Sequence, residues 1–141
     1  RDFQVIGIAG KNEKMKLAFE NIVRENNCSE NVKVLEFTNK VSELMSISDL
    51  VVTKPGGMTT TESLASGLPM IIINPIPGQE VENAEFLESK NIAIWLRKND
   101  DVNEVLTNLF ESPTKLKEMK QNTKLLANIN STRDICDILL K

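Results

Sequence analysis

Two segments of the chain, 54–62 and 77–83, carry the residues best placed to do chemistry. The first reads KPGGMTTTE and the second PGQEVEN. An apolar run at 49–53 feeds the Pro-Gly-Gly turn, and a threonine-rich helix is predicted to start after it, at 59–66. The first amides of a helix have no partner within the helix and lie at the positive end of its dipole. The first segment therefore predicts an anion site, suited to a diphosphate.

Both segments also have simpler structural explanations. A Gly-Gly turn is a common tight connection between a strand and a capped helix. Glu62 lies three residues after Thr59, which is the spacing of a capping box, so its carboxylate could reach back to the Thr59 amide. Glu80 and Glu82 could form a solvated acidic helix start that interacts favourably with the helix dipole.

The second segment predicts a sugar site. Gln79, Glu80 and Asn83 would lie at the start of the next helix, with Asn83 one turn after Gln79, so all three can face one pocket. Their amide and carboxylate groups are donors and acceptors that suit sugar hydroxyls.

Short apolar strands alternating with amphipathic helices are predicted to position these segments. This alternation is typical of a doubly wound, mostly parallel sheet with helices on both faces, so the fold class is α/β. In such sheets ligands bind beyond the carboxyl ends of the strands, where the turns at residues 10, 37–38, 56–57 and 77–78 lie. The predicted strands are 3–9, 32–37, 50–53, 70–73 and 92–96; the predicted helices are 12–25, 41–46, 59–66 ending at Gly67, 79–90, 102–111, one from Pro113 with Ser112 as N-cap, and one from Ser131.

Composition narrows the function. A chain of 141 residues predicts about one domain with its own core. The net charge of -3, without a basic stripe, argues against nucleic acid as a partner. There is no histidine, which leaves Asp and Glu as the main candidates for proton transfer, and no Asp-x-Asp pair, so no metal is expected. The apolar run 70–73, like the other apolar runs of the sequence, is too short to span a membrane.

The order of the loops resembles the C-terminal domain of GT-B glycosyltransferases. Within them it is similar to the group that contains monogalactosyl- and glucosyl-diacylglycerol synthases, relatives of the peptidoglycan N-acetylglucosaminyltransferase in glycosyltransferase family 28. The resemblance covers nearly the whole chain, and together the motifs are more specific than any single glycine motif. They are AGKNE at 9–13, FTN at 37–39, TKPGG at 53–57, and PGQE at 77–80 followed by Asn83.

The resemblance implies a Rossmann-like domain, the C-terminal half of a GT-B fold, with a role for each loop. The amides at 57–59 and a hydroxyl of Thr59 or Thr60 would bind the diphosphate, and Glu62 the two ribose hydroxyls. Gln79 and Glu80 would bind the hexose, with Asn83 making a supporting hydrogen bond. The full set implied for substrate binding is Gly10, Asn12, Thr38, Val41, Gly56, Gly57, Met58, Thr59, Thr60, Glu62, Gln79, Glu80 and Asn83.

The residues expected around the uracil are assigned partly from the resemblance and partly from the residue types. The resemblance gives Thr38 a backbone contact to the ring, with Val41 packing nearby, whereas Phe37 by itself is expected to be core at the end of a strand. Lys11 stands where related sequences often carry arginine, so it keeps the charge for a phosphate but loses the bidentate geometry. The lone tryptophan, Trp95, is expected to pack in the core.

The function implied is the donor-binding domain of a hexosyltransferase that moves a hexose from a UDP-sugar to a lipid acceptor, expected to be diacylglycerol. The catalytic base and the acceptor site would lie in an N-terminal domain outside residues 1–141, no metal or cofactor would be needed, and the enzyme would work at the cytoplasmic face of the cell membrane. Two alternatives are a UDP-N-acetylglucosamine 2-epimerase, which shares this fold, and a non-catalytic UDP-sugar-binding module or subunit. The identity of the hexose stays open.

Overall fold

The computed structural model describes residues 3–127 of the chain, so the predicted helix from Ser131 lies outside the described residues. The chain divides into two compact units between Val41 and Ser42, and each unit is described by itself.

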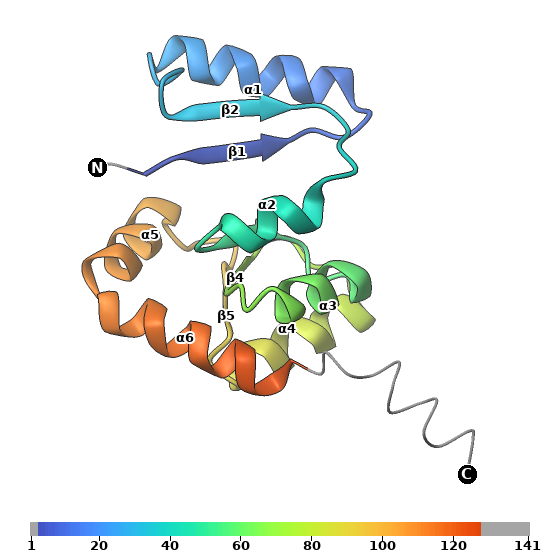
Figure 1. The fold of residues 1–141 in the computed structure, drawn as a ribbon, viewed down its shortest axis with the longest axis vertical. Helices are drawn as coiled ribbons and strands as arrows, with labels where there is room; N and C mark the ends of the chain where they lie inside the picture. Colours follow the sequence, from blue (N-terminus) through green and yellow to red (C-terminus); the bar gives the residue numbers. More distant parts are fainter. Residues whose placement is uncertain (1–2, 128–141) are drawn as a thin grey trace. The chain divides into compact units, whose positions relative to one another are not determined.

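The first unit contains two parallel strands and one helix. The strands β1 (Val5–Ile8) and β2 (Val32–Leu35) pair along their whole length, and α1 (Glu13–Glu25) packs on β2 (Figure 1). Asn12 caps α1 as predicted, because its side chain accepts a hydrogen bond of 3.1 Å from the Met15 amide.

An ion pair also lies in the first unit. Lys16 donates a hydrogen bond to Glu36, which is exposed. This bond raises the pKa of Lys16 and lowers the pKa of Glu36.

The second unit contains a three-stranded parallel sheet in the order β3-β4-β5 (Figure 1). The strands are in register, so Val51 lies beside Met70 and Met70 beside Ala93. The elements are α2 (Val41–Ile47), whose first residue belongs to the first unit, β3 (Val51–Thr53), α3 (Gly57–Ala65), β4 (Met70–Ile72), α4 (Gln79–Ser89), β5 (Ala93–Trp95), α5 (Val102–Glu111) and α6 (Pro113–Leu126).

The central strand β4 is buried on both faces. Met70 and Ile72 pack with Ala84 and Leu87 of α4, and half-buried Leu64 of α3 joins this cluster. Ile71 points to the opposite face, where it packs with residues of α5 and α6. Because side chains alternate along a strand, these two clusters place helices on both faces of the sheet. The expected α/β class with parallel strands is confirmed, and the described strands form one sheet in each unit.

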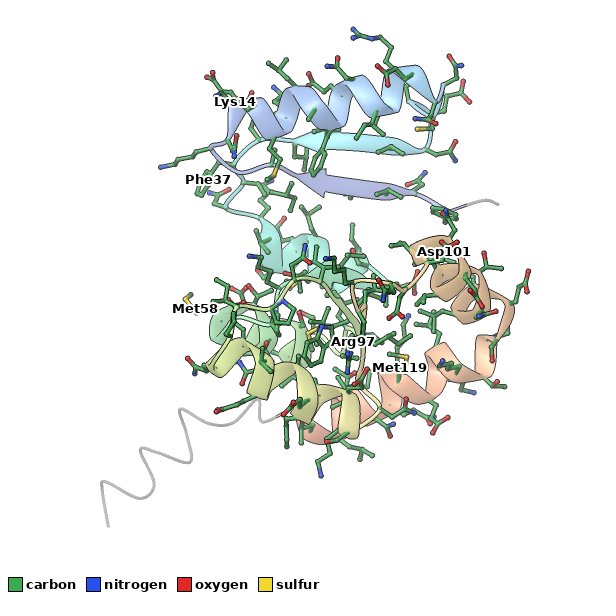
Figure 2. The ribbon with its side chains drawn as sticks, turned by 180° about the vertical axis from the view of Figure 1, so that it is seen from behind. Lys14, Phe37, Met58, Arg97, Asp101 and Met119 are labelled. Carbon is green, nitrogen blue, oxygen red and sulfur yellow. The ribbon has the colours of Figure 1, made fainter. Side chains whose placement is uncertain are left out.

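A stacked cluster at the end of β5 joins this strand to α4. The Arg97 guanidinium lies 3.7 Å from the centroid of the Trp95 ring and forms an ion pair of 2.8 Å with Glu88. Glu88 also accepts a hydrogen bond of 3.2 Å from the Trp95 amide. Trp95 is half-buried against the β4 cluster, in agreement with the core role expected for it. Arg97, which stacks on the Trp95 ring, is labelled in Figure 2.

The start of α3 and the cap of α6 differ from the prediction. The helix α3 begins at Gly57, two residues before the expected start at Thr59, because Gly56 adopts the extended conformation of an N-cap and its carbonyl accepts from the Thr60 amide at 2.9 Å. Ser112 precedes α6 and Pro113 is at its first position, as expected, but the Ser112 side chain makes no capping hydrogen bond. Its hydroxyl lies 3.4 Å from the Thr114 hydroxyl instead.

Gly67 ends α3 with a left-handed backbone. Its φ is +64°, and the amide of the next residue returns to the Ser63 carbonyl at 2.9 Å, as in a Schellman closure. Replacing Gly67 with alanine is expected to lower the free energy of unfolding by about 1 to 2 kcal/mol, because an L residue is strained there. The added Cβ would also lie 3.1 Å from Cε of Lys124.

Urea unfolding followed by circular dichroism measures this change. Ser66→Ala is the matched control, because Ser66 lies one residue earlier in a right-handed conformation, and its effect should stay within about 0.5 kcal/mol. Equal effects of the two substitutions would contradict the importance of the left-handed turn.

Candidate functional site

The two segments singled out in the sequence leave the same edge of the three-stranded sheet. β3 and β4 are parallel neighbours, so their carboxyl ends meet at one edge, and the Ile73 amide continues the pairing to the Thr53 carbonyl at 3.0 Å. The Pro-Gly-Gly turn at 54–57 follows β3, and the loop at 73–78 follows β4. The topology therefore brings the predicted diphosphate turn and the predicted sugar loop together.

The start of α3 has the properties of an anion site. No described residue accepts a hydrogen bond from the amides of Gly57, Met58 or Thr59, whereas the Thr60 amide bonds to the Gly56 carbonyl. The first turn of α3 contains no acidic residue that would compensate the helix dipole. A Cβ placed on Gly56 or Gly57 would meet no described atom within 4 Å, so the backbone borders open space.

The hydroxyls on α3 differ in their availability. The Thr61 hydroxyl donates to the Gly57 carbonyl at 2.9 Å, which occupies it within the helix. The Thr60 hydroxyl is buried and has no partner among the described residues. Thr59 is half-buried, and no described group bonds to its hydroxyl. Of the two threonines proposed for a phosphate contact, Thr59 therefore has the more accessible side chain.

The capping-box explanation of Glu62 is wrong. With Gly56 as the N-cap, the residue three positions on is Thr59, and Glu62 lies a turn further along the helix. Glu62 is exposed, and among residues 3–127 its carboxylate accepts no hydrogen bond and forms no ion pair. Both carboxylate oxygens are thus available to a ligand.

The second segment is fixed by two hydrogen bonds from side chains of α4. A carboxylate oxygen of Glu80 accepts from the Ile76 amide at 2.7 Å, so the acidic helix start is more than a solvated surface. The side-chain amide of Asn83 donates to the Pro55 carbonyl at 2.9 Å and joins α4 to the turn at 54–57. Gln79 is exposed at the first position of α4, after Gly78 with a φ of +102°.

Four of the predicted site residues lie in the first unit. Gly10 turns the chain after β1 with a φ of +64°, and Asn12 caps α1. The Thr38 hydroxyl accepts from the Lys40 amide at 3.1 Å, and Val41 is half-buried at the start of α2. The other nine predicted residues lie in the second unit, where the hydrogen bond from Asn83 to the Pro55 carbonyl joins α4 to the turn before α3.

The expectation that Phe37 belongs to the core is wrong. Its side chain is 66% exposed, because β2 ends at Leu35, two residues before the predicted end, and Phe37 falls in the loop that follows. The ammonium of Lys11, which the sequence suggested for a phosphate, lies 5.4 Å from the centroid of the Phe37 ring (Figure 2 labels Phe37).

Apolar surface and cationic charge both occur beside the α3 start. The Met58 side chain is 81% exposed and extends away from the helix in Figure 2, and Lys54 is exposed just before the turn. Among residues 3–127, no three side chains of the types that ligate metals lie together. No helix within that range is long and apolar enough to cross a membrane.

Sequence reasoning missed two members of the site, the Ile76 amide and the Pro55 carbonyl. Both are backbone groups, which every residue type provides, so their involvement leaves no signal in the sequence. Two shallow hollows on the described surface lie elsewhere, one between α5 and α6 and one beside α1 and β2, and no predicted site residue lines either of them.

Comparison with known proteins gives a consistent result. The family model described as "Glycosyltransferase family 28 C-terminal domain" matches residues 1–137. The chain is 38% identical over 138 residues to a processive diacylglycerol beta-glucosyltransferase of Bacillus subtilis, covering 98% of this chain and 36% of that protein. A processive diacylglycerol beta-glucosyltransferase of Staphylococcus epidermidis is 37% identical over 139 residues, covering 97% of this chain and 34% of that protein. The chain thus spans about a third of the length of these relatives.

Two solved structures share the fold. MurG of Acinetobacter baumannii is 22% identical with a TM-score of 0.75, covering 98% of this chain and 41% of that one. The Anabaena protein HepE, solved in complex with UDP, is 15% identical with a TM-score of 0.70, covering 97% of this chain and 40% of that one. These similarities agree with the expected C-terminal half of a GT-B fold.

Replacing Glu80 with alanine is expected to speed hydrogen exchange at the Ile76 amide, because that amide loses its 2.7 Å acceptor. The free energy of unfolding should fall by about 0.5 to 1.5 kcal/mol, the usual contribution of one hydrogen bond. NMR exchange rates and urea unfolding measure the two effects. Glu85→Ala, an exposed position on the same helix, is the control. An unchanged Ile76 exchange rate would show that Glu80 does not fix the loop.

Proposed function

The chain belongs to the family of glycosyltransferase family 28 C-terminal domains, and from this premise we propose that it binds the UDP-sugar donor of a hexosyltransferase. One observation carries the proposal: three successive amides at the start of α3 have no acceptor among the described residues, and they lie at the sheet edge from which the sugar loop also leaves. A helix start of this kind suits a diphosphate.

Each part of the donor is assigned a set of groups. The amides at 57–59 and the Thr59 hydroxyl bind the diphosphate, with the glycines at 56 and 57 allowing its close approach. The Glu62 carboxylate binds the two ribose hydroxyls. Gln79 and Glu80 bind the hexose, and Glu80 keeps one oxygen free for this while the other accepts from the Ile76 amide. Thr38 and Val41 serve the uracil, with Gly10 and Asn12 in the neighbouring loop.

The transferred sugar is proposed to be glucose and the acceptor diacylglycerol. The support is the printed activity of relatives that are 36% to 38% identical to this chain, processive diacylglycerol beta-glucosyltransferases of three Bacillus species. The match to a transferase family does not favour the alternative of an epimerase. With a lipid acceptor, the enzyme would work at the cytoplasmic face of the cell membrane.

Catalysis is proposed to need an N-terminal domain of the same polypeptide, as in the GT-B arrangement. That domain would supply the acceptor site and the general base, which takes the proton of the attacking hydroxyl as the bond from the sugar to the diphosphate breaks. The contribution of this chain is to stabilise the departing diphosphate through fixed amides that need no reorganisation. Because these amides and a hydroxyl can offset the developing charge, we propose that neither a metal nor a cofactor takes part.

Calorimetric titration of the full-length protein with UDP, in buffer that contains EDTA, tests the proposal. UDP is expected to bind and ADP is not, because the base loop should accept uracil and exclude a purine. UDP-glucose should bind more tightly than UDP-galactose if Gln79 and Glu80 read the hexose. If UDP binds no better than ADP, the donor-site proposal is wrong. If UDP binds only after a divalent metal is added, metal independence is wrong.

Replacing Glu62 with alanine is expected to weaken UDP binding by about 1 to 3 kcal/mol, the range for a hydrogen bond to a charged group. The loss should be much smaller with 2′-deoxy-UDP, which lacks one of the two hydroxyls assigned to the carboxylate. Thermal unfolding should not change, because Glu62 has no partner among the described residues. Glu85→Ala, on a different helix, is the charge-matched control. An equal loss with both nucleotides would rule out the ribose assignment.

A further inference from the structure

The first hydrogen bond of α3 is donated by the Thr60 amide, although a helix that started one residue earlier would begin with the Thr59 amide. In an α-helix the amide of residue i bonds to the carbonyl of residue i−4. The Thr60 amide follows this rule with the Gly56 carbonyl at 2.9 Å. The equivalent partner of the Thr59 amide would be the Pro55 carbonyl, but that carbonyl accepts from the Asn83 side chain at 2.9 Å.

Burial explains why the Pro55 carbonyl needs a partner. The Pro55 side chain is less than 2% exposed, and Asn83 is half-buried where the two meet. A polar backbone group in such a place is paired in almost all proteins, since an unpaired one loses its hydrogen bond to water. If Asn83 did not supply the donor, the Thr59 amide could do so once Gly56 rotated from its extended conformation, with ψ at 149°, into the helix, and the bond to Asn83 opposes that rotation.

We infer that Asn83 is a positioning residue for the diphosphate and that its effect extends beyond the sugar loop that precedes its helix. By occupying the Pro55 carbonyl, Asn83 leaves the Thr59 amide free and offsets the partial negative charge of a carbonyl beside the anion. The same bond sets α4, one turn after its start, against the turn that precedes α3. The inference rests on the proposed function, because the anion in question is the diphosphate of the donor.

Binding to ligands that lack successive parts of the donor separates this role from a contact to the hexose. In the full-length protein, Asn83→Ala is expected to weaken UDP and UDP-glucose by the same factor, about five- to tenfold, as for the loss of one hydrogen bond. Uridine, followed by NMR titration, should bind as before, because it has no phosphate. A contact to the hexose alone would instead weaken UDP-glucose and leave UDP unchanged.

A matched control exists on α6. Asn122 is also half-buried and also donates its side-chain amide to a backbone carbonyl, that of Asn91 at 3.3 Å. Asn122→Ala removes the same chemical group away from the α3 start, and all three affinities should stay as in the unaltered protein. A similar loss of UDP binding in this control would overturn the inference, because it would show a general effect on stability.

Hydrogen exchange of the free protein gives a readout without any ligand. In Asn83→Ala the Thr59 amide should exchange more slowly than in the unaltered protein, because it can pair with the released Pro55 carbonyl. Asn83→Leu, which resembles asparagine in shape but has no donor, should do the same and serves if the alanine variant does not fold.

The outcomes separate the inference from the proposed function. Where the unaltered protein binds UDP, an unchanged UDP affinity in Asn83→Ala, or a loss confined to UDP-glucose, overturns the inference. Where the unaltered protein binds no UDP, the proposed function fails, and exchange of the Thr59 amide alone decides whether Asn83 controls the helix start: slower exchange in the variants supports the inference, and unchanged exchange overturns it.

Discussion

The pairing of β3 with β4 is the constraint on which the described site depends. Their parallel register sends the turn at 54–57 and the loop at 73–78 out of the same edge of the sheet. This register is fixed by packing, because all three residues of β4 are at most 1% exposed and pack against helices on both faces. A slip of one residue would turn Ile71 to the face of Met70, and the close packing of both apolar clusters opposes this exchange. The relative positions of the turn at 54–57 and the loop at 73–78 therefore follow from the pairing of β3 with β4.

At this edge of the sheet, some backbone groups are unpaired and others are hydrogen-bonded to side chains. The amides at the start of α3 have no described acceptor, yet the adjoining Pro55 carbonyl is bonded to Asn83, and the Ile76 amide is bonded to Glu80. Unpaired amides are tolerated at an exposed helix start, where water satisfies them until a ligand arrives, while a buried carbonyl is not. Free amides beside a paired carbonyl are what the proposed diphosphate site requires.

The sequence predicted the elements of the fold more fully than the contacts of the site. Periodicity placed the strands and helices of the described chain, and Gly67 and Pro113 marked a helix end and a helix start, because these signals are local. The start of α3 was misplaced by two residues, since glycine at an N-cap gives no side-chain signal. Phe37 was misassigned because the end of β2 depends on pairing with β1. The bonds of Glu80 and Asn83 to backbone groups depend on tertiary structure, which spacing does not encode.

The proposed contacts to the diphosphate come from the main chain and those to the hexose come from side chains. This difference affects how such a domain can diverge in evolution. The groups at the start of α3 belong to the backbone, so substitutions in the helix leave them in place as long as the glycines and the fold persist. The proposed hexose contacts come from the side chains of Gln79 and Glu80, which a single codon change can replace. On the proposed assignments, substitutions at the start of α4 can change the sugar that is bound, whereas the backbone contacts to the diphosphate persist as long as the glycines and Asn83 are kept.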